Sequence, residues 1–261
     1  MSSINPDPTT LQARAATPHY AAQALEAIVQ IPSAVSPPEL LARLMLATVA
    51  IGASASLYTA AIPEGGREPS CFSLFACHPA FAQAQESQPS LLNHPWFRFA
   101  RTHTLPGTDH QIRIEHGADA AALKLAQQYG FRSCLIVPIP NGRAVDRLEM
   151  LCLGSSEAGT FEGAQARVVR TLARSLAAEL HDWLTSHLRQ RLTEAAQLQE
   201  SDVDLLAMAW RGLGSKDIAG LTGMSTASVD SRFQRINGRL NCPSRKASAM
   251  RAAAYGLLEL V

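Results

Sequence analysis

The spacing of hydrophobic residues changes near residue 200, and this change divides the chain into two parts. Between residues 20 and 188, stretches with helical spacing alternate with short strand-like runs. Beyond residue 200, short amphipathic segments follow one another with almost no linker. The pattern predicts an α+β fold: a mixed domain over 20–188, a polar and partly helical linker over 189–200, and an all-helical domain over 201–261. Residues 1–19 are expected to be flexible.

The all-helical part has the pattern of a helix-turn-helix unit. Ser201 can cap a first helix, which Gly212 stops. A very short second helix begins at Ser215. The tight turn Gly223-Met224-Ser225 then leads into a third helix, which Ser225 caps and which runs to Leu240. Two helices joined by a tight turn that contains Gly are typical of this motif.

Positive charge is concentrated on the third of these helices, although the whole chain has a net charge of only +1. Between Met224 and Arg251, Asp230 is the only acid. The bases of that stretch are Arg232, Arg235, Arg239, Arg245, Lys246 and Arg251. A basic element on a near-neutral chain is expected for phosphate contact. The alternative interpretation is a solvated helix face in an all-helical domain.

This stretch resembles the C-terminal domain of LuxR-type transcription regulators. The positions that match the family's pattern are Asp202, Leu206, Gly212, Asp217-Ile218-Ala219, Ser225, Ser228-Val229 and Arg239-Leu240. The resemblance implies that the third helix enters the major groove of double-stranded DNA. The implied DNA-binding residues are Thr226, Ser228, Asp230, Arg232, Arg235 and Arg239. Two positions depart from the family: Arg232 replaces a usual His, and Asp230 is an acid that would repel phosphate.

The N-terminal part predicts an α-β-α sandwich with an antiparallel sheet. Ser36-Pro37-Pro38-Glu39 is a capping box with Pro at the first helical position, and it starts a helix that runs toward Ile51. Further helices are expected over 21–31, 79–92, 119–129 and 162–188. Strands are expected over 56–62, 71–77, 133–139 and 147–153. Asn141-Gly142 is a hairpin-turn signal between the last two strands.

The resemblance to LuxR-type regulators extends more weakly into this half. The run from Tyr129 to Ser133 is similar to the family's Phe-Gly stretch before a strand, and His94-Pro95 is similar to its Asp-Pro. The resemblance implies a sensor that binds acyl-homoserine lactones between the sheet and a helical layer. The implied ligand-binding residues are Phe81, Gln85, His94, Trp96 and Cys134.

These positions differ from the family's set for lactone recognition. In the family an Asp accepts a hydrogen bond from the ligand amide, and a Trp donates one to the lactone carbonyl. Here His94 could accept through a ring nitrogen, Phe81 has no donor, and Gln85 retains an amide. Two lost hydrogen bonds would weaken an ordinary lactone by a factor on the order of a hundred. The departures favour an orphan, or solo, member of the family. Such a member would either bind another metabolite or have a cavity that is filled by side chains such as Cys134.

The long helix expected over 162–188 carries a line of hydrophobic residues, which can cover the sheet and could also pair with a second copy of the chain. Because one helix-turn-helix covers one half-site, two-fold pairing would match two sites ~34 Å apart on DNA. We therefore expect a homodimer. Its expected seam includes Val169, Leu172 and Leu176.

The composition and motifs of the sequence limit which cellular environment and which further functions are expected. The five cysteines have neither disulfide-like nor metal-like spacing, which favours a reducing, cytoplasmic environment. No signal peptide, membrane span, metal site or cofactor motif is predicted. Gly154-Ser155-Ser156 lacks the spacing of a nucleophile elbow, so we do not expect an enzyme.

One rival function stays open. The protein could heterodimerise with another LuxR-type regulator and inhibit it, with little DNA binding of its own. Asp230 and the missing His are the features that favour this alternative. An enzyme that uses a cysteine or histidine of the N-terminal cavity is a more distant interpretation.

Overall fold

The computed structural model describes residues 11–86, 91–140, 147–163 and 166–258. The expected flexible segment 1–19 is described only from residue 11, where Leu11–Ala15 form a short helix and Leu11 is 6% exposed. Its part through Thr10, like the expected turn at Asn141-Gly142, lies outside the described residues. The chain forms two compact units. The first contains Met1–Ala60, Ser73–Pro140 and Leu148–Trp183, and the second contains Ala61–Phe72, Asn141–Arg147 and Leu184–Val261.

A five-stranded antiparallel sheet lies at the centre of the first unit, with strand order β2-β1-β5-β4-β3. The strands are β1 (Ala55–Ile62), β2 (Ser70–Ala76), β3 (Gly107–Thr108), β4 (Ser133–Ile139) and β5 (Leu148–Ser155). In the register of β4 and β5, Ile136 lies opposite Cys152. All of β4 is buried, which explains why its sequence reads as a continuous hydrophobic run.

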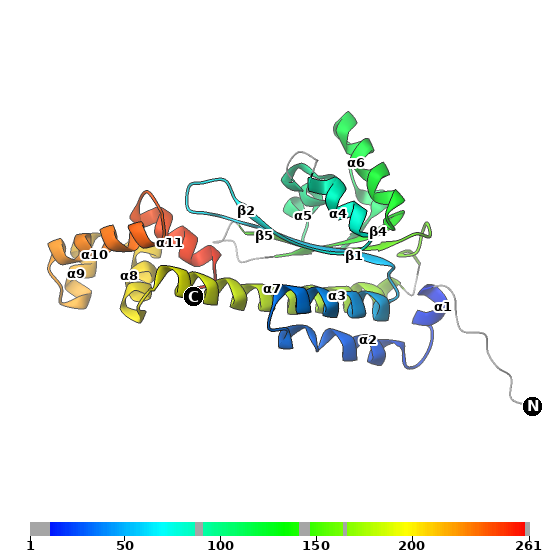
Figure 1. Cartoon of the computed structure of the whole chain (residues 1–261), viewed down its shortest axis with the longest axis horizontal. Coiled ribbons are helices and arrows are strands. Elements are labelled where there is room, and N and C mark those ends of the chain that lie inside the picture. The colour runs from blue at the N-terminus through cyan, green and yellow to red at the C-terminus, as the bar shows by residue number, and fades with distance from the viewer. Residues whose placement is uncertain (1–10, 87–90, 141–146, 164–165, 259–261) are drawn as a thin grey trace, which may run out of the picture. The chain divides into compact units, whose positions relative to one another are not determined.

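Helices cover both faces of this sheet, as Figure 1 shows. On one face lie α4 (Pro79–Glu86), α5 (Pro95–Thr102) and α6 (Gly117–Gln128). On the other lie α2 (Tyr20–Ile28), α3 (Pro37–Ile51) and the first part of α7 (Ala166–Ala196). The short α1 (Leu11–Ala15) precedes α2, and 3-10 turns are found at Ile31–Ser33, Leu91–Asn93 and Asp109–Gln111. The predicted α-β-α sandwich is confirmed.

Local signals in the sequence explain how α3 begins and ends. The Ser36 hydroxyl accepts a hydrogen bond from the Glu39 backbone N–H, and the Glu39 carboxylate accepts one from the Val35 N–H at 3.0 Å. Gly52 ends the helix with φ of 91°, a left-handed conformation that glycine adopts without steric cost. The predicted start and end of this helix are therefore confirmed.

The second unit contains four short helices after the end of α7 (Figure 1): α8 (Glu200–Trp210), α9 (Ser215–Thr222), α10 (Thr226–Arg239) and α11 (Arg245–Ala254). Ser225 caps α10 by accepting a hydrogen bond from the Ser228 N–H at 3.1 Å. The predicted helix-turn-helix is confirmed. The expectation that Ser201 caps α8 is wrong, because the N-cap is Gln199, whose N–H donates to the Asp202 carboxylate at 3.2 Å.

Two further differences concern element boundaries. No helix was predicted after residue 94, but this segment forms α5, in which His94 is the N-cap and Pro95 the first helical residue. Pro, Trp and Phe are weak helix formers, so this short helix depends on its cap and on burial of its aromatic face. In addition, α7 continues to Ala196 and includes most of the predicted linker.

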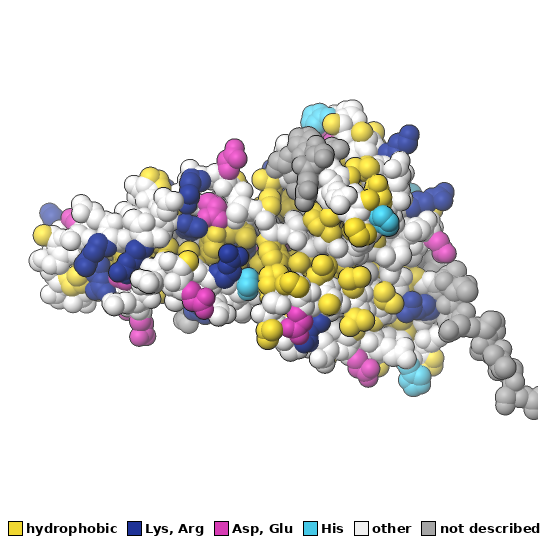
Figure 2. All heavy atoms as spheres, viewed as in Figure 1, with side chains coloured by type: hydrophobic (Ala, Val, Ile, Leu, Met, Phe, Trp, Pro, Cys, Tyr) yellow, Lys and Arg dark blue, Asp and Glu magenta, His cyan; other side chains and the backbone are white. Residues whose placement is uncertain are grey.

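The expected dimer seam on α7 is wrong, because its side chains are buried within a single chain. Val169, Leu172 and Leu176 are 1%, 3% and 0% exposed. On α7 Val168 is 39% exposed, whereas a larger group of exposed hydrophobic residues lies on or directly after α2 and on α3, where Figure 2 shows hydrophobic side chains gathered. We call this set the α2–α3 patch; it consists of Leu25, Val29, Met45, Leu46 and Val49, which are 43–68% exposed.

A buried carboxylate links the sheet to α7. Glu149 on β5 is fully buried and accepts a hydrogen bond from the Tyr58 hydroxyl at 2.5 Å. His181 on α7 contacts the other carboxylate oxygen at 3.1 Å. A buried charge is tolerated only when it is paired and hydrogen-bonded, and Glu149 meets this condition within the unit.

Candidate functional site

Helix α10 buries one side and exposes the other. Val229, Phe233 and Ile236 are buried. Thr226 and Arg235 are exposed, and no hydrogen bond or ion pair is found for Arg235 among the described residues. With respect to the described chain, Arg235 is therefore a free cation on the solvent side of the second helix of the helix-turn-helix.

Two of the other predicted DNA-binding arginines contact an acid of the same domain. Asp202 on α8 is 4% exposed, and its carboxylate accepts from Arg232 Nε at 2.9 Å and from Arg239 Nη1 at 3.4 Å. Arg239 also donates to the Gln197 carbonyl at 3.1 Å. These contacts hold α10 against the start of α8.

Asp230 also has partners within the domain. Its carboxylate accepts from the Ser215 hydroxyl at 2.5 Å and from Arg245 Nη2 at 2.9 Å. The Arg245 guanidinium lies over the Phe233 ring at 4.2 Å from its centroid, which adds a cation–π contact. Asp230 therefore joins α9, α10 and α11, and its charge is compensated locally. Ser228 likewise contacts the Ser225 hydroxyl at 2.8 Å, so it belongs to the cap of α10.

Other exposed bases of this domain lie outside the predicted set. Arg211, Lys216 and Lys246 are exposed, and none has a hydrogen bond or ion pair within the part that the structure describes. Figure 2 shows Lys and Arg side chains around this group of helices. Arg211 and Lys216 precede α10 in sequence, so an analysis confined to that helix could not include them.

All five predicted ligand-binding residues are buried: Phe81, Gln85, His94, Trp96 and Cys134 are 0%, 8%, 8%, 1% and 2% exposed. Phe131 connects most of them. Its ring centroid is 5.2 Å from those of Phe81 and Trp96, and its carbonyl accepts from Cys134 Sγ at 3.3 Å. Gln85 is also buried, and among the described residues no hydrogen bond joins it to this group. Phe131 lies within the motif from Tyr129 to Ser133, but the sequence did not indicate that its side chain would be central.

Further aromatic rings extend this cluster along the face of the sheet that α4, α5 and α6 cover. Phe81 contacts Phe75 and Tyr129, with ring centroids 6.1 and 5.8 Å apart. Edge and tilted arrangements of this kind are the favoured geometry of aromatic pairs. The layer that the resemblance assigns to the ligand is therefore rich in aromatic side chains. We call it the aromatic layer; its rings are Phe75, Phe81, Trp96, Tyr129 and Phe131.

His94 and Trp96 place polar atoms in this layer. His94 Nδ1 accepts a hydrogen bond from the Trp96 backbone N–H at 3.3 Å. Burial, together with the charge of Arg98, lowers the pKa of His94 to about 4. The two rings meet edge to face with centroids 4.6 Å apart. Among the described residues, His94 Nε2 and Trp96 Nε1 are buried without a hydrogen-bond partner.

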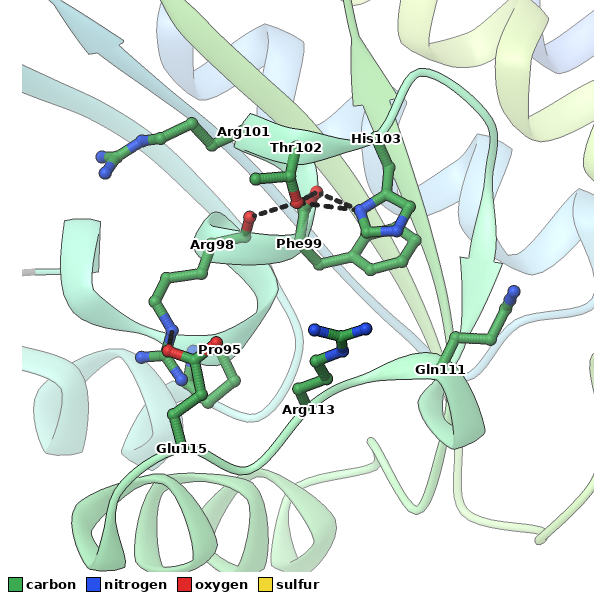
Figure 3. A pocket seen from close by; sticks show the side chains of 9 residues that line it. All are labelled: Pro95, Arg98, Phe99, Arg101, Thr102, His103, Gln111, Arg113 and Glu115. Atoms are coloured by element: carbon green, nitrogen blue, oxygen red, sulfur yellow. Dashed lines mark hydrogen bonds and ion pairs between the residues drawn. The ribbon is translucent and has the colours of Figure 1, made fainter.

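The outer side of α5 borders an open cleft of about 590 Å³, shown in Figure 3. Arg98 on this side pairs with Asp119 at 2.5 Å and with Glu115 at 3.3 Å. The hydrogen bonds from Arg98 hold the pKa of the Asp119 carboxyl well below its usual range. Arg113 extends toward the cleft in Figure 3, and no partner is found for it in the described part of the chain. The cleft therefore has an excess of positive charge.

Neither metal nor thiolate chemistry has support in the described residues. They contain no group of three or more His, Cys, Asp or Glu side chains that could hold a metal ion. Burial raises the pKa of the Cys77 thiol to about 11 and also raises that of Cys152. Thiols with raised pKa values are poor nucleophiles at neutral pH. No helix within the described ranges is both long and hydrophobic enough to span a bilayer.

The two-domain α+β fold is that of LuxR-family transcription regulators. The crystal structure of Escherichia coli SdiA is similar, with a TM-score of 0.68 and 14% sequence identity over 91% of this chain and 99% of that chain. A structure of SdiA in complex with octanoyl-rac-glycerol gives the same TM-score and identity over 92% of this chain and 97% of that chain.

The N-acylhomoserine-lactone-dependent LuxR-family factor CepR2 from Burkholderia cenocepacia is also similar. Its TM-score is 0.50 and its identity 14%, over 63% of this chain and 93% of that chain. No family model matches the sequence, and no curated protein sequence matches it significantly. At this level of identity the likeness establishes the fold.

Proposed function

We propose that the protein is a transcription regulator that binds double-stranded DNA through α10. The observation that carries this proposal is Arg235: an exposed, unpaired base on the second helix of a helix-turn-helix whose other arginines have intramolecular partners. Free cations suit phosphate and guanine, the two groups that arginine contacts most often in DNA. Thr226, at the exposed start of α10, is the proposed residue for contact with base edges.

The remaining predicted residues receive positioning roles in this proposal. Arg232 and Arg239 orient α10 through Asp202, and Ser228 completes the cap. Asp230 is bonded to Ser215 and Arg245, so its negative charge is offset before DNA arrives. This removes one reason for the alternative of a heterodimerising inhibitor that does not bind DNA.

Arg235→Ala tests the DNA-binding proposal. We expect DNA affinity to fall about 10- to 100-fold, because one arginine contact contributes ~1–3 kcal/mol. The dependence of log affinity on log salt concentration should become shallower by about one unit, since one phosphate neutralisation is lost. Both quantities can be measured by fluorescence anisotropy with the purified full-length protein and a labelled genomic fragment that it retains.

Arg101→Ala is the matched control, because Arg101 is an exposed arginine of α5 in the first unit. It should leave affinity and salt dependence unchanged. If Arg235→Ala matched the wild type in both quantities, α10 would not be the DNA-binding element. If the purified wild type retained no DNA at low salt, the heterodimerising inhibitor would become the better proposal.

A homodimer is part of this proposal, with the α2–α3 patch in place of the seam first expected on α7. The patch is a set of large hydrophobic side chains on two adjacent helices, and such exposed groups mark interaction surfaces. A second copy is the proposed occupant, because one helix-turn-helix covers one half-site and two-fold symmetry pairs two of them.

Val49→Glu tests this interface. Val49 is 62% exposed, so the substitution costs a single chain little but places a charge in the proposed seam. We expect light scattering at micromolar concentration to show a dimer for the wild type and a monomer for the variant. Leu105→Glu, at a position 66% exposed between α5 and β3, is the control and should stay dimeric. A monomeric wild type would refute the homodimer, and a dimeric Val49→Glu variant would refute the interface.

We also propose that the aromatic layer of the first unit is a sensor for a small molecule other than an ordinary acyl-homoserine lactone. The support is chemical. Phe81 has no donor, and His94 replaces the acidic acceptor that the resemblance implies. Both residues are buried at the centre of the layer.

A further inference from the structure

Two buried nitrogen atoms in the aromatic layer lack partners among the described residues, and they belong to rings that meet edge to face. His94 Nε2 and Trp96 Nε1 have no hydrogen bond within the described chain, and their rings are 4.6 Å apart. A buried polar group without a partner costs about as much as a lost hydrogen bond, so native proteins keep few of them. An adjacent pair therefore indicates a partner from outside the chain.

The hydrogen bond at the start of α5 determines the chemical character of His94. Nδ1 accepts the Trp96 backbone N–H, so Nδ1 carries no proton. Burial lowers the pKa of the ring to about 4, and the ring is therefore neutral at physiological pH. A neutral imidazole has one proton, which must then lie on Nε2. This assignment makes His94 Nε2–H a donor, in place of the acceptor that the sequence led us to expect.

Trp96 has the same character, because an indole nitrogen can only donate. We propose that His94 Nε2 and Trp96 Nε1 together bind the oxygen acceptors of a neutral acyl ester, a ligand that presents no N–H group to this site. The inference rests on the proposed function in one respect, namely that the aromatic layer is a sensor.

The surroundings of the pair define the rest of the ligand. Trp96 packs against Phe131, so the ligand body at this point must be hydrophobic. A carboxylate is disfavoured because Arg98, the cation whose charge acts on His94, is already paired with Asp119 and Glu115. An amide is disfavoured because its N–H would face two donors and stay unpaired. The acyl ester of the SdiA complex, octanoyl-rac-glycerol, is a compound of the favoured class.

The experiment compares two probes that differ in one group: octanoyl-rac-glycerol and the corresponding amide, in which an N–H replaces the linking ester oxygen. Binding of each to the purified full-length protein is measured by titration calorimetry at neutral pH without DNA. We expect the wild type to bind the ester about tenfold more tightly than the amide, since an unpaired N–H costs ~1–3 kcal/mol and about 1.4 kcal/mol corresponds to a factor of ten.

Two near-isosteric variants separate hydrogen-bond polarity from shape. Asp and Asn are both good N-caps, so His94→Asp and His94→Asn should each preserve the start of α5. His94→Asn keeps a donor and should retain the ester preference. His94→Asp offers only an acceptor at neutral pH, and its preference should reverse in favour of the amide. Trp96→Phe removes the second donor without removing the ring, and it should weaken ester binding about tenfold.

Several results would overturn the inference. They are a wild type that binds neither probe, equal affinity for both probes, or a preference that is the same in His94→Asp and His94→Asn. If His94→Asp did not fold, as judged by its melting curve, unchanged ester binding in Trp96→Phe would overturn the inference by itself. None of these measurements involves DNA, so a failure here is distinguishable from a failure of the DNA-binding proposal.

Discussion

The helix-turn-helix domain and the aromatic layer differ in whether their polar side chains have partners within the described chain. In the helix-turn-helix domain, Asp202 forms ion pairs with Arg232 and Arg239, and Asp230 forms one with Arg245. In the aromatic layer, the donors on His94 and Trp96 are buried without partners among the described residues. The first arrangement fixes the position of a helix, whereas the second leaves hydrogen-bonding capacity unused.

This difference indicates which groups serve the fold and which serve a ligand. A charged side chain with an intramolecular partner has already contributed its interaction to folding, as Arg232 has. A group for which the described residues offer no partner, such as exposed Arg235 or Nε2 of buried His94, can still bind something from outside. The contrast between the two regions can therefore be tested by removing groups of each kind.

The largest expected effect concerns Asp202. Asp202→Asn should lower the free energy of unfolding of the helix-turn-helix domain by about 3 kcal/mol, because it leaves two arginines without their buried acid. Chemical denaturation followed by circular dichroism measures this change. Asp204→Asn is the control, since Asp204 is exposed two positions further along the same helix, and its effect should stay below about 0.5 kcal/mol. Equal effects in the two variants would mean that Asp202 does not hold α10 in place.

The second effect is a pH dependence that originates at His94. Burial lowers its folded-state pKa to about 4, against an ordinary value of 6.5. Between these values the unfolded chain binds a proton that the folded chain does not, so stability falls as pH decreases from 6.5 to 4. At 1.36 kcal/mol per pKa unit, the loss is at most about 3 kcal/mol.

His94→Asn isolates this contribution, because asparagine does not titrate. The difference in unfolding free energy between wild type and variant should change over that pH range and stay constant above it. The Arg98–Asp119 pair does not interfere, since the lowered pKa of Asp119 confines its titration to more acidic pH. A difference that is constant from neutral pH to pH ~4 would show that His94 is not buried in its neutral form.

The smallest effect concerns the cap of α10. Ser225→Ala removes the acceptor for the Ser228 N–H and should cost about 1 kcal/mol, seen as a lower melting temperature. Ser231→Ala, at an exposed position within the same helix, should be neutral or slightly stabilising. If the two variants melted together, the hydroxyl of Ser225 would contribute no capping energy.

The sequence predicted those parts of the fold whose signals are local. The capping box at Ser36 and the cap at Ser225 both depend on residues a few positions apart. Helix α5 was missed because its stability comes from burial, which depends on distant strands. The sequence could not decide what the hydrophobic side of α7 contacts, because covering a sheet and pairing with a second copy require the same line of hydrophobic residues. In the structure Leu176 on this side is buried within one chain.

The sequence indicated which residues are candidates for the sites, but it did not indicate which residues they contact. The resemblance indicated His94 and the arginines of α10, and the described residues show what each of them contacts. The sequence could not show that Asp202 lies within reach of Arg232, 30 positions away, or that His94 Nδ1 is already used as an acceptor. These contacts decide which of the candidate groups stay available for DNA or a ligand.

The most direct test of the central claim is genome-wide footprinting of the tagged protein beside its Arg235→Ala variant. If α10 reads DNA, wild-type footprints should share a sequence with two half-sites about one helical turn apart, and the variant should lose these sites while its cellular level is unchanged. Footprints that are absent in the wild type, or identical in both proteins, would contradict the account.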